Sequence, residues 1–244
     1  MAKSKRNQRK SWKGYFLEFL MLFLAVTLGF MADNFREKSS ERAKEKEYIQ
    51  SMIEDVNEDR INAQEVIEVN TKRVEALDSL LNKSFNFNGT EKEMLELNRY
   101  FVQVLIHPEF LTPAELTMQQ LKNAGGMRLI KSKKSINEIL RYDTKLKKIS
   151  NQQLYYENYQ NKAIASGVKI FNIHELLTSI RSNDSNIIPD RFTLLETDPL
   201  FIKTFGNDVA MYKGIIEYYI MLLTELNEQG EVLIGTLKKE YRIR

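Results

Sequence analysis

The pattern of hydrophobic and polar residues first sets apart one segment near the start of the chain. Residues 14–32, GYFLEFLMLFLAVTLGFMA, include one charged residue, Glu18, and one polar residue, Thr27. A helix over this range would be about 28 Å long, close to the thickness of the hydrocarbon core of a bilayer. Because the segment is apolar on every face, it predicts a transmembrane helix over residues 14–32.

After this segment, apolar residues recur at spacings of three, four and seven, which is typical of amphipathic helices. The pattern predicts three long helices, at about 35–82, 133–178 and 208–241. The first of them is expected to continue the transmembrane helix outward with little break. Its apolar stripe consists of Ile49, Met52, Val56, Ala63, Ile67, Val74, Leu77 and Leu81.

Capping residues and prolines predict shorter helices between the long ones. Thr90 and Glu93 form a capping box, and the helix that they open is expected to end near Ile106, before Pro108. Residues 112–115, Thr-Pro-Ala-Glu, predict another helix start, with proline at the first helical position.

The last helix signals complete the fold class. Residues 181–198 are expected to form a loop, and Asp198-Pro199 predicts a short helix that ends near Gly206. No segment of useful length alternates with a period of two, so strands are not expected. The predicted fold class is all-α: an N-terminal transmembrane helix followed by an elongated antiparallel helical bundle.

Charge adds an orientation to this picture. Residues 1–13 contain six Lys or Arg and no acid, which leaves 30 basic and 32 acidic residues for 33–244 once Glu18 is set aside. The pI near 8.8 therefore comes from the tail, and no nucleic-acid partner is expected. The positive-inside rule predicts a cytoplasmic basic tail (1–13) and a helical soluble domain (33–244) on the other side, which is the periplasm if the cell has two membranes. Five basic residues within 36–46 weaken the contrast, although acids are interleaved with them.

Two other interpretations of the apolar segment stay open. It could be the buried helix of a soluble protein, or a signal peptide cleaved near residues 27–29, Thr-Leu-Gly, since a basic region precedes it. The chain contains no cysteine, so no disulfide framework or thiolate site is expected.

Within the apolar segment, Glu18 has a functional and a structural interpretation. An ionisable group inside a membrane span is a candidate functional residue. Because Glu18 lies only about 7–8 Å along the axis from Lys13, it can also reach the membrane interface by extending its side chain. Ala25 and Gly29 form a pair of small residues that lets two membrane helices approach, which favours a homo-oligomer.

The most unusual text outside the anchor is NAGGMRLIKS, residues 123–132. Gly125 and Gly126 are typical of a helix stop, after which the following apolar residues pack back onto the bundle. The functional alternative makes Arg128 a contact for an anion or carboxylate in a tight corner.

No other segment predicts chemistry. His107 and His174 stand alone, and His174 lacks the second histidine of a zinc-protease helix. Residues 55–59 imitate the start of a calcium loop but lack its glycine and final acid, so a solvated acidic face is expected there. No catalytic residue, cofactor or metal is predicted.

Several segments together carry a resemblance: the text around Trp12 and Tyr15, TLGFMADNFRE, EYIQSMIEDVNED and LTMQQLKNAGGMRLI. They are similar to an uncharacterised family of bacterial single-pass membrane proteins, a domain-of-unknown-function family. Its members have a glutamate early in the membrane helix, which matches Glu18, and a serine-glycine where this chain has residues 124–126, Ala-Gly-Gly. The resemblance implies a bacterial inner-membrane setting and supplies no activity.

These observations lead to three functional hypotheses. The first is a non-enzymatic, membrane-anchored interaction or scaffold protein, held in the bilayer by residues 14–32, which binds a protein partner or forms a homo-oligomer. The second is a ligand-sensing helical bundle with a small molecule near Arg128. The third is an enzyme whose site is assembled only by folding.

Overall fold

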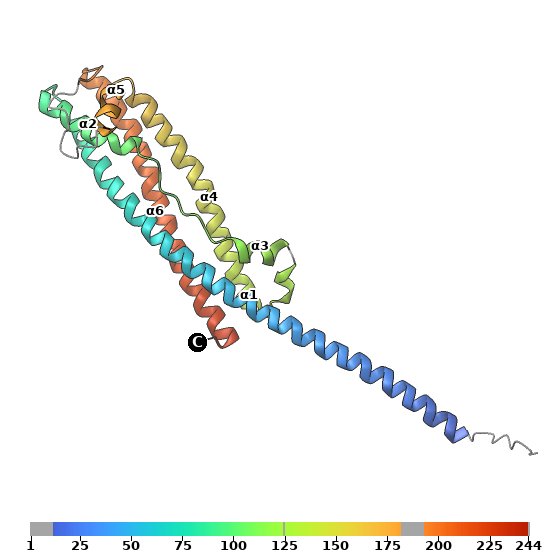
Figure 1. Cartoon of the computed structure of the whole chain (residues 1–244). Coiled ribbons are helices and arrows are strands. Elements are labelled where there is room, and N and C mark those ends of the chain that lie inside the picture. The colour runs from blue at the N-terminus through green and yellow to red at the C-terminus, as the bar shows by residue number, and fades with distance from the viewer. Residues whose placement is uncertain (1–11, 124, 182–192, 244) are drawn as a thin grey trace, which may run out of the picture.

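The computed structural model describes residues 12–123, 125–181 and 193–243, and the regular structure in these ranges is helical apart from one isolated bridge between Phe171 and Leu194. The all-helical prediction is confirmed. The elements are α1 (Trp12–Phe85), α2 (Glu91–Leu105), α3 (Leu116–Asn123), a 3-10 helix η1 (Gly126–Leu129), α4 (Lys133–Gly167), α5 (Ile173–Arg181) and α6 (Pro199–Tyr241) (Figure 1). Most of the basic tail and most of the loop predicted at 181–198 lie outside the described residues.

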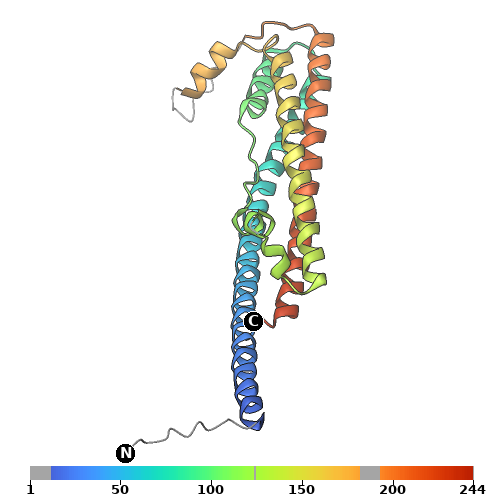
Figure 2. The same cartoon turned by 90° about the vertical axis from the view of Figure 1, so that its right-hand side faces the viewer.

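Helix α1 is continuous over 74 residues and joins the apolar segment to the core that it forms with the other helices. Its first buried residue is Glu45, and most of the part before Glu45, here called the free-standing part, projects beyond the other helices, as Figures 1 and 2 show. The segment contains no proline that would interrupt its hydrogen bonds. The expected continuation of the apolar helix into the 35–82 helix is therefore present as one helix.

The helical core is built on α1, α4 and α6, which lie side by side (Figures 1 and 2). Glu45 of α1 bonds to Tyr241 of α6, while Asp78 of α1 pairs with Lys213 of α6. Residue numbers therefore rise along α1 as they fall along α6.

Aromatic side chains fill the core in two clusters. Tyr156, Tyr212 and Tyr219 are fully buried, and their rings meet edge to face at centroid distances of 5.5–5.8 Å. Nearer the end away from the apolar segment, Phe101 stacks on Phe171 at 4.0 Å. Since buried aromatic rings supply large apolar areas, these clusters hold α2, α4 and α6 together.

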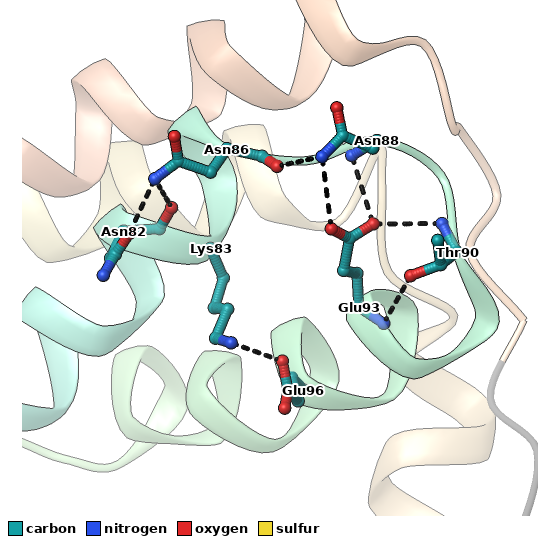
Figure 3. Close-up of polar contacts among 7 residues, drawn as sticks. All are labelled: Asn82, Lys83, Asn86, Asn88, Thr90, Glu93 and Glu96. Atoms are coloured by element: carbon teal, nitrogen blue, oxygen red, sulfur yellow. Dashed lines mark hydrogen bonds and ion pairs between the residues drawn. The ribbon is translucent and has the colours of Figure 1, made fainter.

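The turn between α1 and α2 follows its local sequence (Figure 3). The Thr90 hydroxyl accepts from the Glu93 amide at 3.3 Å, and the Glu93 carboxylate accepts from the Thr90 amide at 3.0 Å. This is the predicted capping box. An ion pair of 2.6 Å between Lys83 and Glu96 then ties α2 to α1.

The predicted helix start at residues 112–115 is wrong, because α3 begins at Leu116. The Ala114 amide donates to Asp59 at 2.7 Å, and the Thr117 amide donates to Asp55 at 3.2 Å. Asp59 of α1 therefore binds the Ala114 amide, which lies within reach of a Thr112 cap, and residues 112–115 stay outside the helix.

Two predicted boundaries in the second half of the chain also differ. Helix α4 ends at Gly167 and not near residue 178, because the chain turns there and places Phe171 against Phe101. Helix α6 runs through Gly206 without a break, so Gly206 does not end a short helix. Its role is in packing: a Cβ at Gly206 would lie 3.3 Å from the Phe85 ring, and the glycine lets α6 approach the end of α1 closely.

Candidate functional site

The corner at residues 123–132 turns the chain from α3 into α4, and its two glycines have different roles. Gly125 has φ 70° and ψ 17°, in the left-handed region that favours glycine. Gly126 has little space around it, because a Cβ there would lie 3.2 Å from Leu121 Cα and 3.3 Å from the Tyr48 ring. The corner therefore reverses direction at Gly125 and approaches α1 at Gly126.

The residues after the glycines fasten the corner to the bundle, as the helix-stop interpretation predicts. Ile130 is buried, and the Lys131 amide donates to the carboxylate of Glu45 at 2.6 Å. The Tyr241 hydroxyl donates to the same carboxylate at 2.7 Å. Burial and the contact with Glu45 raise the pKa of Tyr241, so this hydroxyl stays protonated. One buried carboxylate on α1 thus binds both the corner and the last turn of α6.

An open cleft of about 740 Å³ lies between the corner and the free-standing part of α1. It brings together Gly125, Gly126 and Arg128, three of the four candidate residues. The facing wall of α1 contributes Asp33, Arg36, Glu37, Ser40, Glu41, Lys44 and Tyr48. Because acids and cations alternate on this wall, the cleft can contact a ligand that carries both signs of charge.

Arg128 is exposed on the edge of this cleft, and it forms no ion pair with any residue that the structure describes. Its guanidinium lies beside Gly125, with Nε 3.8 Å from the position of a Cβ on that glycine. The side chain is therefore available to contact an anion from solvent.

Glu18 is not part of this site. It lies on the exposed, free-standing part of α1, 27 residues before Glu45, which is about 40 Å along the helix axis. The two candidate regions of the sequence are therefore separate.

A second polar arrangement follows the extended segment 106–115, here called the strap, which lies along the long helices between α2 and α3 (Figure 1) and buries Leu111 against them. Buried side chains of the long helices satisfy its main chain. The carbonyls of Ile106, His107, Glu109 and Leu111 accept from Gln160, Arg73, Asn70 and Gln153 at 2.7–3.1 Å. The Leu111 amide donates to the Tyr219 hydroxyl at 2.9 Å. These bonds explain how a segment without secondary structure can stay packed on the long helices.

Arg73 is the most deeply buried cation described, with 4 % of its surface exposed. It donates to the Tyr156 hydroxyl at 2.9 Å and to the His107 carbonyl at 2.7 Å, and Tyr156 in turn donates to Asn70 at 2.6 Å. Burial, followed by the neighbouring Tyr212, raises the pKa of Tyr156. A protonated phenol held on both sides is suited to fixing the strap and is a poor acid or nucleophile.

The expected solvated acidic face at residues 55–59 is wrong for Asp59, which is 1 % exposed. Its carboxylate accepts from the Tyr142 hydroxyl at 2.8 Å as well as from Ala114. Burial raises the pKa of Asp59, and the two hydrogen bonds lower it by less. Asp59 is therefore a structural residue that holds the start of α3.

The two histidines lie apart from one another in the fold, His107 on the strap and His174 on α5, and both are exposed. No group of three or more His, Asp or Glu side chains suited to a metal occurs among the residues that the structure describes. The described polar side chains thus form a cleft and a set of structural contacts.

Glu45 and the cleft wall formed by residues 33–48 were not predicted from the sequence. A signal for Glu45 was present, because it lies four residues before Ile49 on the same stripe as the apolar residues of α1. An acid at a core position of a helix indicates a buried hydrogen-bond acceptor.

Comparisons of the chain with protein-family models, with curated proteins and with solved structures find no match. Proposals about function therefore depend on the geometry of the chain itself. On that geometry α1 is long and apolar enough to cross a membrane, and none of its most apolar window is buried against the rest of the protein.

Proposed function

We propose that this chain is a membrane-anchored, non-enzymatic interaction or scaffold protein, an elongated antiparallel helical bundle on a single transmembrane stalk. The observation that carries the proposal is the continuity of α1, which joins an exposed apolar segment to the bundle core. A helix that belonged to a soluble core would bury this apolar surface. An inner-membrane location is part of this proposal.

The anchor is retained in the mature chain under this proposal. Mass spectrometry of the membrane-extracted protein is expected to give a chain that still contains residues 14–32. A mature N-terminus at or after Gly29 would instead identify a signal peptide and end the anchor proposal.

The bundle lies outside the cytoplasm and the basic tail lies inside it. The reason is that the segment before the transmembrane helix contains basic residues and no acids, whereas the segment after it contains both. A reporter fused after residue 244 that is active only outside the cytoplasm is expected to function. Activity of a cytoplasm-only reporter at the same position would reverse the topology. Replacing the basic residues of the tail by Gln tests whether their charge causes this topology. The variant should give a mixture of chains inserted in the two orientations.

A scaffold function needs partner surfaces, and α4 offers exposed apolar side chains. Leu154 and Tyr155 are 61 % and 58 % exposed although Tyr156 beside them is fully buried. Aromatic residues of this kind are enriched at protein interfaces. Crosslinking in native membranes followed by pull-down is expected to recover a protein partner, a second copy of the chain, or both. Recovery of the monomer alone would contradict the scaffold proposal.

A homo-oligomer would form through the anchor and the 35–82 part of α1. The pair Ala25 and Gly29 supports this, because small residues four positions apart let two membrane helices approach closely. Gly29→Leu is expected to reduce the crosslinked dimer, whereas Thr27→Leu, on the opposite side of the helix, is the control. Glu18→Gln in the same assay, together with a measurement of membrane insertion, separates a functional carboxylate from one that only reaches the interface.

A second candidate function is ligand sensing at the cleft, favoured by the juxtaposition of Arg128 with the charged wall of α1. Thermal-shift screening against small metabolites that carry both charges should then find a stabilising compound. The shift should be lost in Arg128→Ala and kept in Arg99→Ala, an exposed arginine of α2. No hit, together with unchanged behaviour of Arg128→Ala, would remove this candidate.

A further inference from the structure

Basic side chains gather at the end of the bundle from which the free-standing part of α1 emerges. They come from the corner and start of α4 and from the last turn of α6, and each is exposed. We call them the basic face: Arg128, Lys131, Lys133, Lys134, Lys238, Lys239 and Arg242. Two bonds hold the segments together, one from the Ser132 hydroxyl to Glu240 at 3.0 Å and one from the Tyr241 hydroxyl to Glu45 at 2.7 Å.

The charge of this face is not neutralised by its surroundings. Within residues 128–134 and 238–243 the only acid is Glu240. The adjacent stretch of α1, residues 33–47, contains five acids and five bases and is neutral. Of the basic face, only Lys131 has an ion pair among the described residues, a long one of 3.7 Å to Glu41 that is largely exposed.

Helix stability explains the lysines that the basic face takes from α6 but not those that it takes from α4. Lys238 and Lys239 lie in the last turn of α6, where cations are favourable to the helix dipole. Lys133 and Lys134 lie in the first turn of α4, which contains no acid, so they are unfavourable to that helix. Two lysines beside the amide groups of a helix N-terminus instead favour the approach of an anion from outside.

The proposed anchor places the basic face near the surface of the membrane that holds residues 14–32. Thirteen residues of helix separate Ala32, the end of the apolar segment, from Glu45, a rise of about 20 Å. The headgroup layer occupies roughly 5–8 Å of that distance, and charges act over a Debye length of about 8 Å. Membrane helices commonly tilt by about 20°, and a tilt of α1 toward α4 and α6 lowers the basic face further toward the lipid.

We propose that the basic face binds the anionic lipid headgroups of the membrane that holds the anchor, so that the bundle leans onto an anionic bilayer. The occupant is the lipid surface itself, identified by charge complementarity and by the continuity of α1 into the bilayer. This inference rests on the proposed membrane anchor.

The test uses the full chain in lipid nanodiscs. Because the chain has no cysteine, Asn137→Cys places a single fluorescent donor beside the basic face, and a headgroup-labelled lipid serves as acceptor. Energy transfer is expected to be higher in phosphatidylcholine discs containing phosphatidylglycerol than in pure phosphatidylcholine discs. The increase should disappear at high salt, which screens exposed charges.

The decisive variant replaces Lys133, Lys134, Lys238 and Lys239 by Gln and should lose the increase. Its matched control replaces four exposed lysines elsewhere on the chain, Lys72, Lys92, Lys169 and Lys203, by Gln and should keep it. Circular dichroism of both variants verifies that the helix content is unchanged.

Three results would overturn the basic-face proposal: equal transfer in the two kinds of disc, an increase that survives high salt, or an equal loss in both variants. Failure of the anchor gives a different result, because the chain would then not incorporate into discs of either composition.

Discussion

Gly125 provides a direct test of the corner, because this position requires a left-handed backbone but has room for a side chain. A Cβ at this position would meet only the Arg128 guanidinium, at 3.8 Å, which is ordinary van der Waals contact. Gly125→Ala therefore changes the backbone energy and little else. An L-residue in the left-handed region costs about 1–2 kcal/mol, whereas Asn tolerates this region better than Ala.

The same substitution at Gly214 has the opposite expectation. Gly214 lies inside α6 on an exposed face, and a Cβ there would meet nothing within 4 Å. Replacing such a glycine by alanine stabilises a helix by roughly 0.5–1 kcal/mol. Gly125→Ala and Gly214→Ala should thus differ by about 2 kcal/mol in the free energy of unfolding. For a domain of this size each kcal/mol corresponds to a shift of about 2–4 °C in Tm.

The measurement is thermal unfolding in mild detergent, followed by far-ultraviolet circular dichroism. Gly214→Ala should unfold at a higher temperature than the wild type, Gly125→Ala at a lower one, and Gly125→Asn between the wild type and Gly125→Ala. An increase in Tm for Gly125→Ala similar to that for Gly214→Ala would refute the argument from backbone conformation.

Three further predictions concern the core. Gly167→Ala would place a Cβ inside the stacked Phe101 ring and should destabilise the bundle by about 1–3 kcal/mol in the same melting assay. Tyr156→Phe removes an acceptor from buried Arg73 and should cost about 1–3 kcal/mol, whereas exposed Tyr155→Phe should cost little; equal effects would contradict the role of the hydroxyl. Burial raises the folded-state pKa of Asp59 above its ordinary 3.8, so the folded chain holds this proton more tightly than the unfolded one. The wild type should therefore lose stability relative to Asp59→Asn as the pH rises from 3.8 to the raised pKa; urea unfolding across this range that shows no such decline would contradict it.

Local sequence predicted those helix boundaries whose interactions are local. Thr90 and Glu93 bond to each other across one turn, so the letters alone specify the start of α2. Residues 112–115 also begin with Thr and have Glu three positions later, yet Asp59 binds the Ala114 amide from far along the chain. A short stretch of sequence around residue 112 does not reveal that a distant carboxylate competes for this amide.

The candidate site shows the same division. The reversal at Gly125 is encoded by neighbouring residues and was predicted. The opposite wall of the cleft belongs to residues 33–48, which meet the corner only because Glu45 binds the Lys131 amide and Gly126 lets Tyr48 approach. The predicted apolar stripe of α1 did not include Asn70 and Arg73, which are buried because they bond to the main chain of the strap.

Under the proposed membrane anchoring, the unbroken length of α1 also fixes the rotation of the bundle relative to the bilayer. One residue inserted between positions 33 and 44 would rotate the whole bundle by about 100° around the axis of α1 and raise it by about 1.5 Å. Seven inserted residues would raise it by about 10 Å and leave it only about 20° from its original azimuth. The length of the helix therefore sets both the height of the bundle above the lipid and the azimuth of each of its faces around the axis of α1.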